Sequence, residues 1–300
     1  MINTGKEFPD MIKLGNVDSV AQAINISSQL HNHWFRGEDQ FFGESALTPG
    51  LIRYNRIIKT VTSESFLSLE GYIFGEFRRL APMYMNSPPA PNDFFTWLIL
   101  MQHYGCKTRI LDWSENLLVA LYFATDTNSY EKDGYLWVLM PWRLNGLTTG
   151  QGVASIFFHD DSPVQYYCRE AYYVDRLEDL LEELKLEKKP EFPLGASISH
   201  SFSRGSFQES CMTIHPNPRN EEGELLRNQL LDLIDTNMLP DTLGYYLVPA
   251  SCKAKIRREL FSIGFHPEKI FADLDNLSKS IFMKLDIMAQ EGDAVPPRLI

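Results

Sequence analysis

The chain has 300 residues, of which 44% are hydrophobic, and a formal net charge of −11 at pH 7. A chain of this length and composition can bury the core of one large domain. The negative charge disfavours broad binding to a nucleic-acid backbone, and no run of about 18 apolar residues predicts a membrane helix. The N-terminus has neither the basic start nor the apolar core of an export signal, so we expect a cytoplasmic protein without membrane contact.

The first predicted elements are an N-terminal helical extension, residues 1–30, and a strand that carries Arg36. The aromatic pair before Arg36 favours the strand, and Gly37 permits close approach of a backbone or a ligand. Two interpretations of Arg36 remain open. Its guanidinium either pairs with a carboxylate such as Glu38 or grips a phosphate or carboxylate of a ligand with two hydrogen bonds.

A long amphipathic helix is predicted over residues 63–85, where apolar residues recur at steps of three and four. Glu70 and Glu76 fall on other faces of this helix. We expect both carboxylates to be exposed to solvent. The alternative is that one of them pairs with an arginine of a functional site. A stiff proline-rich connector, residues 87–93, ends the helix, and Asp93 can cap the next one.

The stretch from Trp97 to Ala124 combines two buried helices with a polar crossover. Residues 97–101 are apolar on every helical face, so the first helix should lie in the core and end at Gly105. The second helix is predicted over residues 117–124, with Ser114 as its N-terminal cap.

The polar residues Thr108, Arg109 and Asp112 lie in this predicted crossover. A buried charge without a partner costs several kcal/mol, so Arg109 and Asp112 should pair with each other, with other buried groups or with a ligand. If the two pair, the main role of Asp112 is to stabilise the fold and not to catalyse a reaction. Its replacement by alanine should then lower the free energy of unfolding by on the order of 2 to 4 kcal/mol. His103, next to the crossover, is interpreted either as an acid or base or as a hydrogen-bonded core histidine.

The second half of the chain adds a strand at residues 135–139 and a charged helical insertion near 165–192. The amphipathic helix at 175–189 within it is interpreted as an exposed insertion or a partner contact. The alternation that begins at Phe207 predicts a strand with Gln208 and Glu209 on opposite faces, so only one of them can face a given pocket.

The C-terminal part is predicted to contain a strand, a capped helix and a short terminal helix that starts after Asp275. The capped helix carries a basic run at residues 253–258. We interpret this run as a solvated helix face in preference to a nucleic-acid contact.

Several classes of site lack their signature in this sequence. The cysteines, at positions 106, 168, 211 and 252, are too far apart for a metal-binding pair and are expected to be reduced core residues. His31 and His33 suit one strand face, but no third ligand is spaced for a metal, so no metal site is predicted. The glycine-rich dinucleotide loop, the phosphate loop, the nucleophile elbow and the HExxH motif are also missing.

Residues 102–124, QHYGCKTRILDWSENLLVALYFA, resemble the central signature of the FRG domain family. The family takes its name from a second motif, which Trp34-Phe35-Arg36-Gly37 resembles here. Further family-like segments are LTPGLIR at 47–53, DGYLWVL at 133–139, RGSFQESCMTIH at 204–215 and GFHPEKIFADLDNLSKSI at 264–281. The resemblance implies an FRG domain over residues 31–285, followed by a C-terminal tail, residues 286–300. Ser210 and Met212 replace the glycine and phenylalanine that are usual in the family.

The order of these motifs is also similar, more loosely, to that of ADP-ribosyltransferases. That likeness implies an α+β fold with an ADP-ribosyltransferase-like split β-sheet core and surrounding helices. It implies an NAD-using mono-ADP-ribosyltransferase-like effector, toxin or phage-defence protein of bacteria, with a protein acceptor. The rival hypothesis is a non-catalytic ligand-sensing or protein-binding module that binds a nicotinamide nucleotide, another anionic ligand or a partner protein.

The candidate residues follow from these resemblances. The catalytic candidates are Arg36, His103, Gln208 and Glu209. The candidates for holding NAD, the substrate, are Arg36, Gly37, Gln102, Tyr104, Thr108, Arg109, Asp112, Trp113 and Arg204. We expect Arg36, Arg109, Asp112 and Gln208 to converge on one concave site, because each interrupts an apolar or strand-like segment. Whether Glu209 or Gln208 faces that site separates the hypotheses, because an amide cannot be a general base.

Overall fold

The computed structural model describes residues 12–58, 62–126, 131–150, 156–197, 210–226, 228–235, 242–271 and 274–291. Its strands are β1 (Ile12–Asn16), β2 (Trp34–Glu38), β3 (Ile110–Ser114), β4 (Gly134–Leu139), β5 (Phe157–Phe158), β6 (Leu194–Ser197), β7 (Ser210–Ile214) and β8 (Leu243–Val248). They form one open sheet in the order β1-β8-β4-β2-β3-β7-β6-β5. The sheet is mixed, because β1 with β8 and β5 with β6 are parallel and the other pairs are antiparallel. The predicted α+β class is confirmed.

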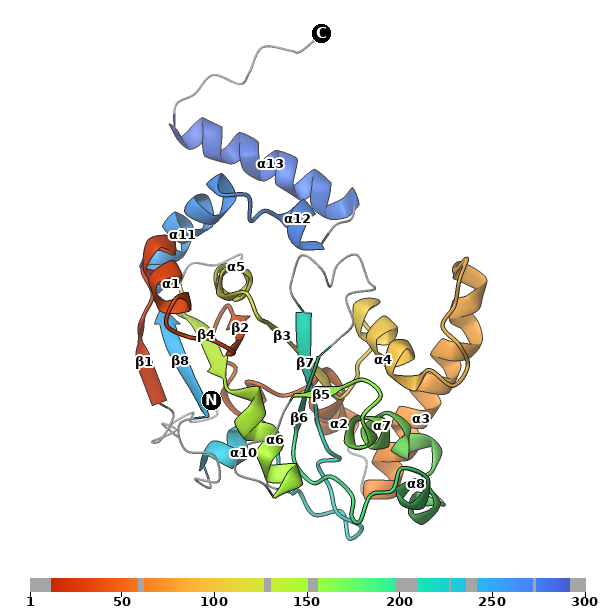
Figure 1. Ribbon diagram of the computed structural model, residues 1–300. Helices are drawn as coiled ribbons and strands as arrows, with labels where there is room; N and C mark the ends of the chain where they lie inside the picture. The colour runs from red at the N-terminus through yellow and green to blue at the C-terminus, as the bar shows by residue number, and fades with distance from the viewer. Residues whose placement is uncertain are drawn as a thin grey trace.

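Helices gather in groups around the sheet (Figure 1). In one group, α1 (Val20–Ser27), α5 (Leu117–Thr125) and α11 (Ala250–Ser262) lie beside β1, β8, β4 and β2. Helices α12 (Pro267–Phe271) and α13 (Leu274–Glu291) lie beyond them, farther from the sheet. A second group, at the end of the sheet formed by β5, β6 and β7, consists of α2 (Gly50–Ile58), α3 (Ser63–Leu80), α4 (Phe94–His103), α7 (Ser162–Arg169) and α8 (Leu177–Glu183). Two further helices are α6 (Pro141–Thr149) and α10 (Leu230–Asp235), and short 3₁₀ turns are η1 (Gly43–Ser45), η2 (Ala81–Tyr84) and η3 (Glu170–Tyr172).

Alternate residues of the central strands serve two different cores. Phe35 and Val138 pack with α5, α1 and α11 on one face of the sheet. Trp34 and Trp137 pack with residues of α6 and α10 on the other face, as the two-residue repeat of a strand requires. Strands β2 and β4 are therefore buried on both sides.

The sheet is weakest between β2 and β3, which pair only at Phe35 and Ser114. On either side of this junction the ladders are continuous, since β3 pairs with β7 along its length and β2 pairs with β4 along its length. The strands β2, β3 and β7, which carry or follow the three polar motifs of the sequence, are thus neighbours.

Gly37 allows the backbone of α5 to lie directly on β2. A Cβ atom added at Gly37 would collide with the carbonyl oxygen of Ala120 and the amide nitrogen of Ala124. The space that Gly37 leaves open is therefore occupied by a helix backbone, which was one of the two expectations, and a ligand at this point is excluded.

Several local expectations are wrong. The N-terminal extension is not purely helical, because β1 pairs with β8 and belongs to the sheet. The crossover after α4 is largely a strand, β3, and Asn116 rather than Ser114 caps α5 by accepting a hydrogen bond from the Leu118 amide. In contrast, Asp93 caps α4 as predicted, by accepting from the Thr96 amide.

The basic run on α11 is not a purely solvated face. Lys253 is fully buried, and its ammonium donates to the Asp39 carbonyl at 2.5 Å. Arg257, one turn later, lies 4.4 Å from the centre of the Tyr122 ring and pairs with Asp126 at 3.1 Å. Residues four apart share a helix face, so these two cations hold α11 against its neighbours.

The charged helical insertion predicted near 165–192 begins within α7, where Tyr166, Tyr167 and Cys168 are buried. The charged segment that follows is helical only over α8, where Leu180 is buried. At the C-terminus, α13 extends to Glu291, so part of the expected tail is helix. None of the helices in the described ranges is long and apolar enough to cross a membrane.

Gly37→Ala should destabilise the protein by about 3 kcal/mol, because the added methyl group meets rigid helix backbone and the strand must move away from α5. Gly75→Ala is the matched control, since this helical glycine of α3 has open space around it and alanine should stabilise the helix by up to about 1 kcal/mol. Urea unfolding monitored by circular dichroism measures both changes. Equal stability of Gly37→Ala and the wild type would contradict the contact.

Candidate functional site

Arg109 is the most completely bound side chain of the polar motifs. It is 1% exposed, and its Nε donates to both carboxylate oxygens of Glu70 at 2.8 and 2.9 Å. Its Nη1 donates to Glu170 at 2.5 Å and to the carbonyl of His215 at 2.9 Å. Its Nη2 donates to the carbonyl of Tyr167 at 2.9 Å and lies 2.8 Å from Glu70. These contacts use all the N–H donors that a guanidinium has.

Of the alternatives left open for Arg109, pairing with other buried groups is the one the structure shows, and pairing with Asp112 is wrong. Glu70 is buried and pairs with this arginine, so the expectation that it is solvated is also wrong. Burial alone would lower the pKa of Arg109, but attraction to Glu70 and Glu170 outweighs burial and raises that pKa above its ordinary value. Burial also raises the pKa of Glu170, although the charge of Arg109 opposes the shift. The cluster is a buried ion network on α3, β3 and η3, with no donor of Arg109 left for a ligand.

Asp112 lies on the exposed side of β3 and belongs to a separate group of polar side chains. Gln102 donates from Nε2 to the Asp112 carboxylate at 2.9 Å and accepts from the Thr108 hydroxyl at 2.5 Å. Arg36 donates from Nη1 to the backbone carbonyl of Asp112 at 2.7 Å. We call Arg36, Gln102, Thr108 and Asp112 the β2–β3 polar cluster.

Glu38, which is buried, contacts this cluster through Arg36. Its buried carboxylate accepts from the Leu47 amide at 3.3 Å and from the Trp137 indole at 3.1 Å, and Arg36 Nε lies 3.5 Å away. The pairing of Arg36 with Glu38, one of the two interpretations of Arg36, is thus present at a long distance. Arg36 keeps a partly exposed side chain between the buried carboxylate of Glu38 and the backbone carbonyl of Asp112.

Trp113 lies in the core and not in a nicotinamide pocket. Its indole donates to the Thr213 hydroxyl at 3.0 Å, and that hydroxyl lies 3.0 Å from Nε2 of His215. Nδ1 of His215 lies 2.8 Å from Oε1 of Gln229. A single tautomer of His215, with its proton on Nδ1, satisfies the whole chain of hydrogen bonds.

His215 was missed by the sequence interpretation, although a histidine two residues after a threonine at the end of a buried strand is a usable signal. Burial lowers the pKa of His215 to about 3. The hydrogen bond to Gln229 opposes this shift, and the positive charges of Arg109 and Arg36 add to it. The imidazole is therefore neutral at physiological pH and fixes the end of β7.

The remaining candidates are scattered or lie outside the described residues. His103 and Tyr104 are exposed at the end of α4, with their ring centres 4.9 Å apart, so the core-histidine interpretation of His103 is wrong. Arg204, Gln208 and Glu209 fall in the range 198–209, which is not described. Of the expected convergent set, the structure brings Arg36 and Asp112 together and directs Arg109 elsewhere.

The described residues contain no group of three or more histidine, cysteine, aspartate or glutamate side chains that could hold a metal ion. In the β2–β3 polar cluster, Asp112 is exposed and Arg36 and Gln102 are partly exposed, whereas the hydroxyl of Thr108 is buried and supports Gln102. The exposed and partly exposed groups can bind and orient a polar ligand.

Residues 31–133 match the family model described as FRG domain. No curated protein and no solved structure matches the chain. The FRG assignment is thus supported for the segment that contains β2, α3, α4, β3 and α5. The likeness to ADP-ribosyltransferases remains a hypothesis.

Glu70→Ala should lower the free energy of unfolding by about 3 to 5 kcal/mol, because Arg109 then keeps a buried charge without its main partner. Asp112→Ala is the control on the same motif, and it should change stability by less than about 1 kcal/mol because that carboxylate is exposed. Chemical denaturation measures both values. A larger effect at Asp112 than at Glu70 would reverse the assignment of the two carboxylates.

The pH dependence of stability should contain a contribution from His215. Its pKa in the folded protein, about 3, lies below the ordinary value of 6.5, so the unfolded chain binds the proton more tightly. Stability is therefore complete above the unfolded pKa and falls as the pH decreases, by about 1.4 kcal/mol per unit between about pH 6 and 4.

His215→Gln should remove this component of the slope, whatever its effect on absolute stability, and His31→Gln should retain it because His31 is exposed. Urea unfolding at a series of pH values gives the slopes. Parallel slopes for wild type and His215→Gln would show that folding does not lower the pKa of His215.

Proposed function

We propose that the chain is a non-catalytic ligand-sensing or protein-binding module of the FRG type, with the β2–β3 polar cluster at its binding surface. The observation that carries this proposal is the complete use of the Arg109 donors by Glu70, Glu170 and two carbonyls. The most characteristic arginine of the signature thus maintains the fold and has no donor for a phosphate.

The chemistry of the cluster supports a ligand that carries hydrogen-bond donors as well as acceptors. Asp112 presents an exposed carboxylate, already aligned by Gln102. Arg36 is the nearest cation, but it already donates to a carbonyl and faces Glu38. A diphosphate would meet one partly occupied guanidinium next to the carboxylate of Glu38, which is a weak anion site.

The second candidate is the NAD-using mono-ADP-ribosyltransferase-like effector, toxin or phage-defence protein. One observation favours it, namely the adjacency of β2, β3 and β7 in the sheet. In this hypothesis Arg36 contacts NAD, and Glu209 stabilises the oxocarbenium-like state that forms when the nicotinamide bond breaks.

The wild-type protein, incubated with NAD for hours with and without cell lysate as a source of acceptor, should release no free nicotinamide above the buffer control. Chromatography measures the nicotinamide. The reason for this expectation is that the described cluster provides neither a free cation pair for the diphosphate nor a buried ionised carboxylate without partners.

Release of nicotinamide by the wild type, abolished in Glu209→Gln and retained in Glu221→Gln, would overturn the module and establish the enzyme. Glu221 is a suitable control because it is an exposed glutamate of a turn. The Glu209→Gln exchange keeps the shape of the side chain and removes only its charge.

A further inference from the structure

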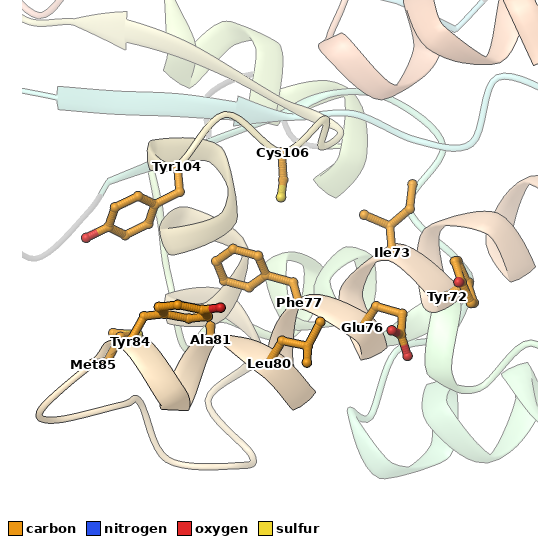
Figure 2. A pocket seen from close by; sticks show the side chains of 10 residues that line it. All are labelled: Tyr72, Ile73, Glu76, Phe77, Leu80, Ala81, Tyr84, Met85, Tyr104 and Cys106. Carbon is orange, nitrogen blue, oxygen red and sulfur yellow. The ribbon is translucent and has the colours of Figure 1, made fainter.

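An apolar groove runs between the last turns of α3 with η2 and the loop that follows α4 (Figure 2). Its volume is about 620 Å³. Phe77 lies at its centre, Tyr84 and Tyr104 lie together at one end, and Glu76 and Tyr72 lie toward the other. The groove is separate from the β2–β3 polar cluster, although both use residues at the end of α4.

Aromatic side chains give this groove an unusual amount of exposed apolar surface. Tyr72, Tyr84 and Tyr104 are 69%, 83% and 66% exposed. Large apolar side chains that gather around a concavity mark a binding site more often than isolated ones do. The volume lies within the range of about 300 to 1,000 Å³ that is usual for sites of small molecules.

The charge of the residues that line the groove indicates which small molecules can bind there. Of the lining residues that the structure describes, Glu76 is the one with a formal charge. A hydrogen bond from Arg79 lowers the pKa of Glu76, so the carboxylate is ionised at neutral pH. An anionic ligand would therefore meet a negative group and no cation among these lining residues, which disfavours a nucleotide.

The partner of Glu76 does not block a cationic ligand. Arg79 contacts the carboxylate at 3.1 and 2.7 Å, one helical turn away on the surface of α3. Both side chains are exposed, and such surface pairs contribute little to stability. A ligand ammonium can therefore share or replace this contact, while the tyrosine faces add cation–π attraction.

We infer that the groove binds a small organic cation with an apolar body, which stacks against Phe77, Tyr84 and Tyr104 while its ammonium group lies next to Glu76. This inference goes beyond the module proposed above and does not depend on it. A cation with an aromatic or aliphatic body several carbons long fits both the size and the charge of the groove.

Three probes with the same body test the inference, namely 4-phenylbutylammonium, 4-phenylbutan-1-ol and 4-phenylbutanoate. Saturation-transfer NMR and calorimetry with the full chain measure their affinities at neutral pH. The ammonium should bind about 3- to 10-fold more tightly than the alcohol, and the carboxylate should bind most weakly, since a charge contact and cation–π attraction distinguish the three.

Exchange of the two charged residues should shift this order in opposite directions. Glu76→Gln should abolish the preference for the ammonium, whereas Arg79→Gln should strengthen it by freeing the carboxylate. Glu178→Gln, at an exposed glutamate of α8, should change nothing. Tyr104→Ala should weaken all three probes, and because Tyr104 is largely exposed the fold should persist.

Equal binding of the three probes, or no binding of any at millimolar concentration, would overturn the inference. A concentration-dependent dimer in sedimentation that Tyr104→Ala abolishes would also overturn it, since the groove would then be a contact between two copies of the chain. Nicotinamide release is independent of these readouts, so failure here leaves the proposed module untouched.

Discussion

The ion network around the buried guanidinium of Arg109 is the interaction on which the position of β3 depends. It joins the start of β3 to Glu70 of α3, Glu170 of η3, and the backbone at the ends of α7 and β7. These segments come from distant parts of the chain, and loss of either carboxylate removes part of the compensation of a charge in the core. The network therefore fixes the position of β3, and this rigid strand presents Asp112 on its exposed side.

The junction between β2 and β3 depends on a second constraint, the close approach of α5. Because these strands share one residue pair, their hydrogen bonds contribute little to holding the two parts of the sheet together. Helix α5 packs on β2, β3 and β4, and Gly37 allows its backbone to touch the strand. Packing across the junction, more than the ladder itself, thus keeps Arg36 beside the Asp112 carbonyl.

The elements that were predicted correctly depend on local patterns. The apolar run of α4, the Asp93 cap and the β-rich composition of β4 each act within a few residues. The partners of Arg109 could not be found in this way, because Glu70 and Glu170 lie 39 and 61 residues away in sequence. Asp112 is the carboxylate nearest to Arg109 in sequence, and a predicted loop leaves their pairing possible. In a strand, however, residues three apart point to opposite faces, so the pair could not form.

The ion network also joins the segment matched to the FRG family to later parts of the chain, so we expect that segment not to fold as an isolated unit. Residues 31–133 contain Arg109 and Glu70, but Glu170 and the carbonyls of Tyr167 and His215 come from later in the chain. Strand β3 likewise pairs with β7, and β2 pairs with β4, which begins at Gly134, directly after the match. Without these later strands, the matched segment would expose two long strand edges and leave part of a buried guanidinium unpaired, both of which are unfavourable. The signature QHYG to ALYFA thus describes the centre of a larger folding unit whose stability depends on residues that the family match does not include.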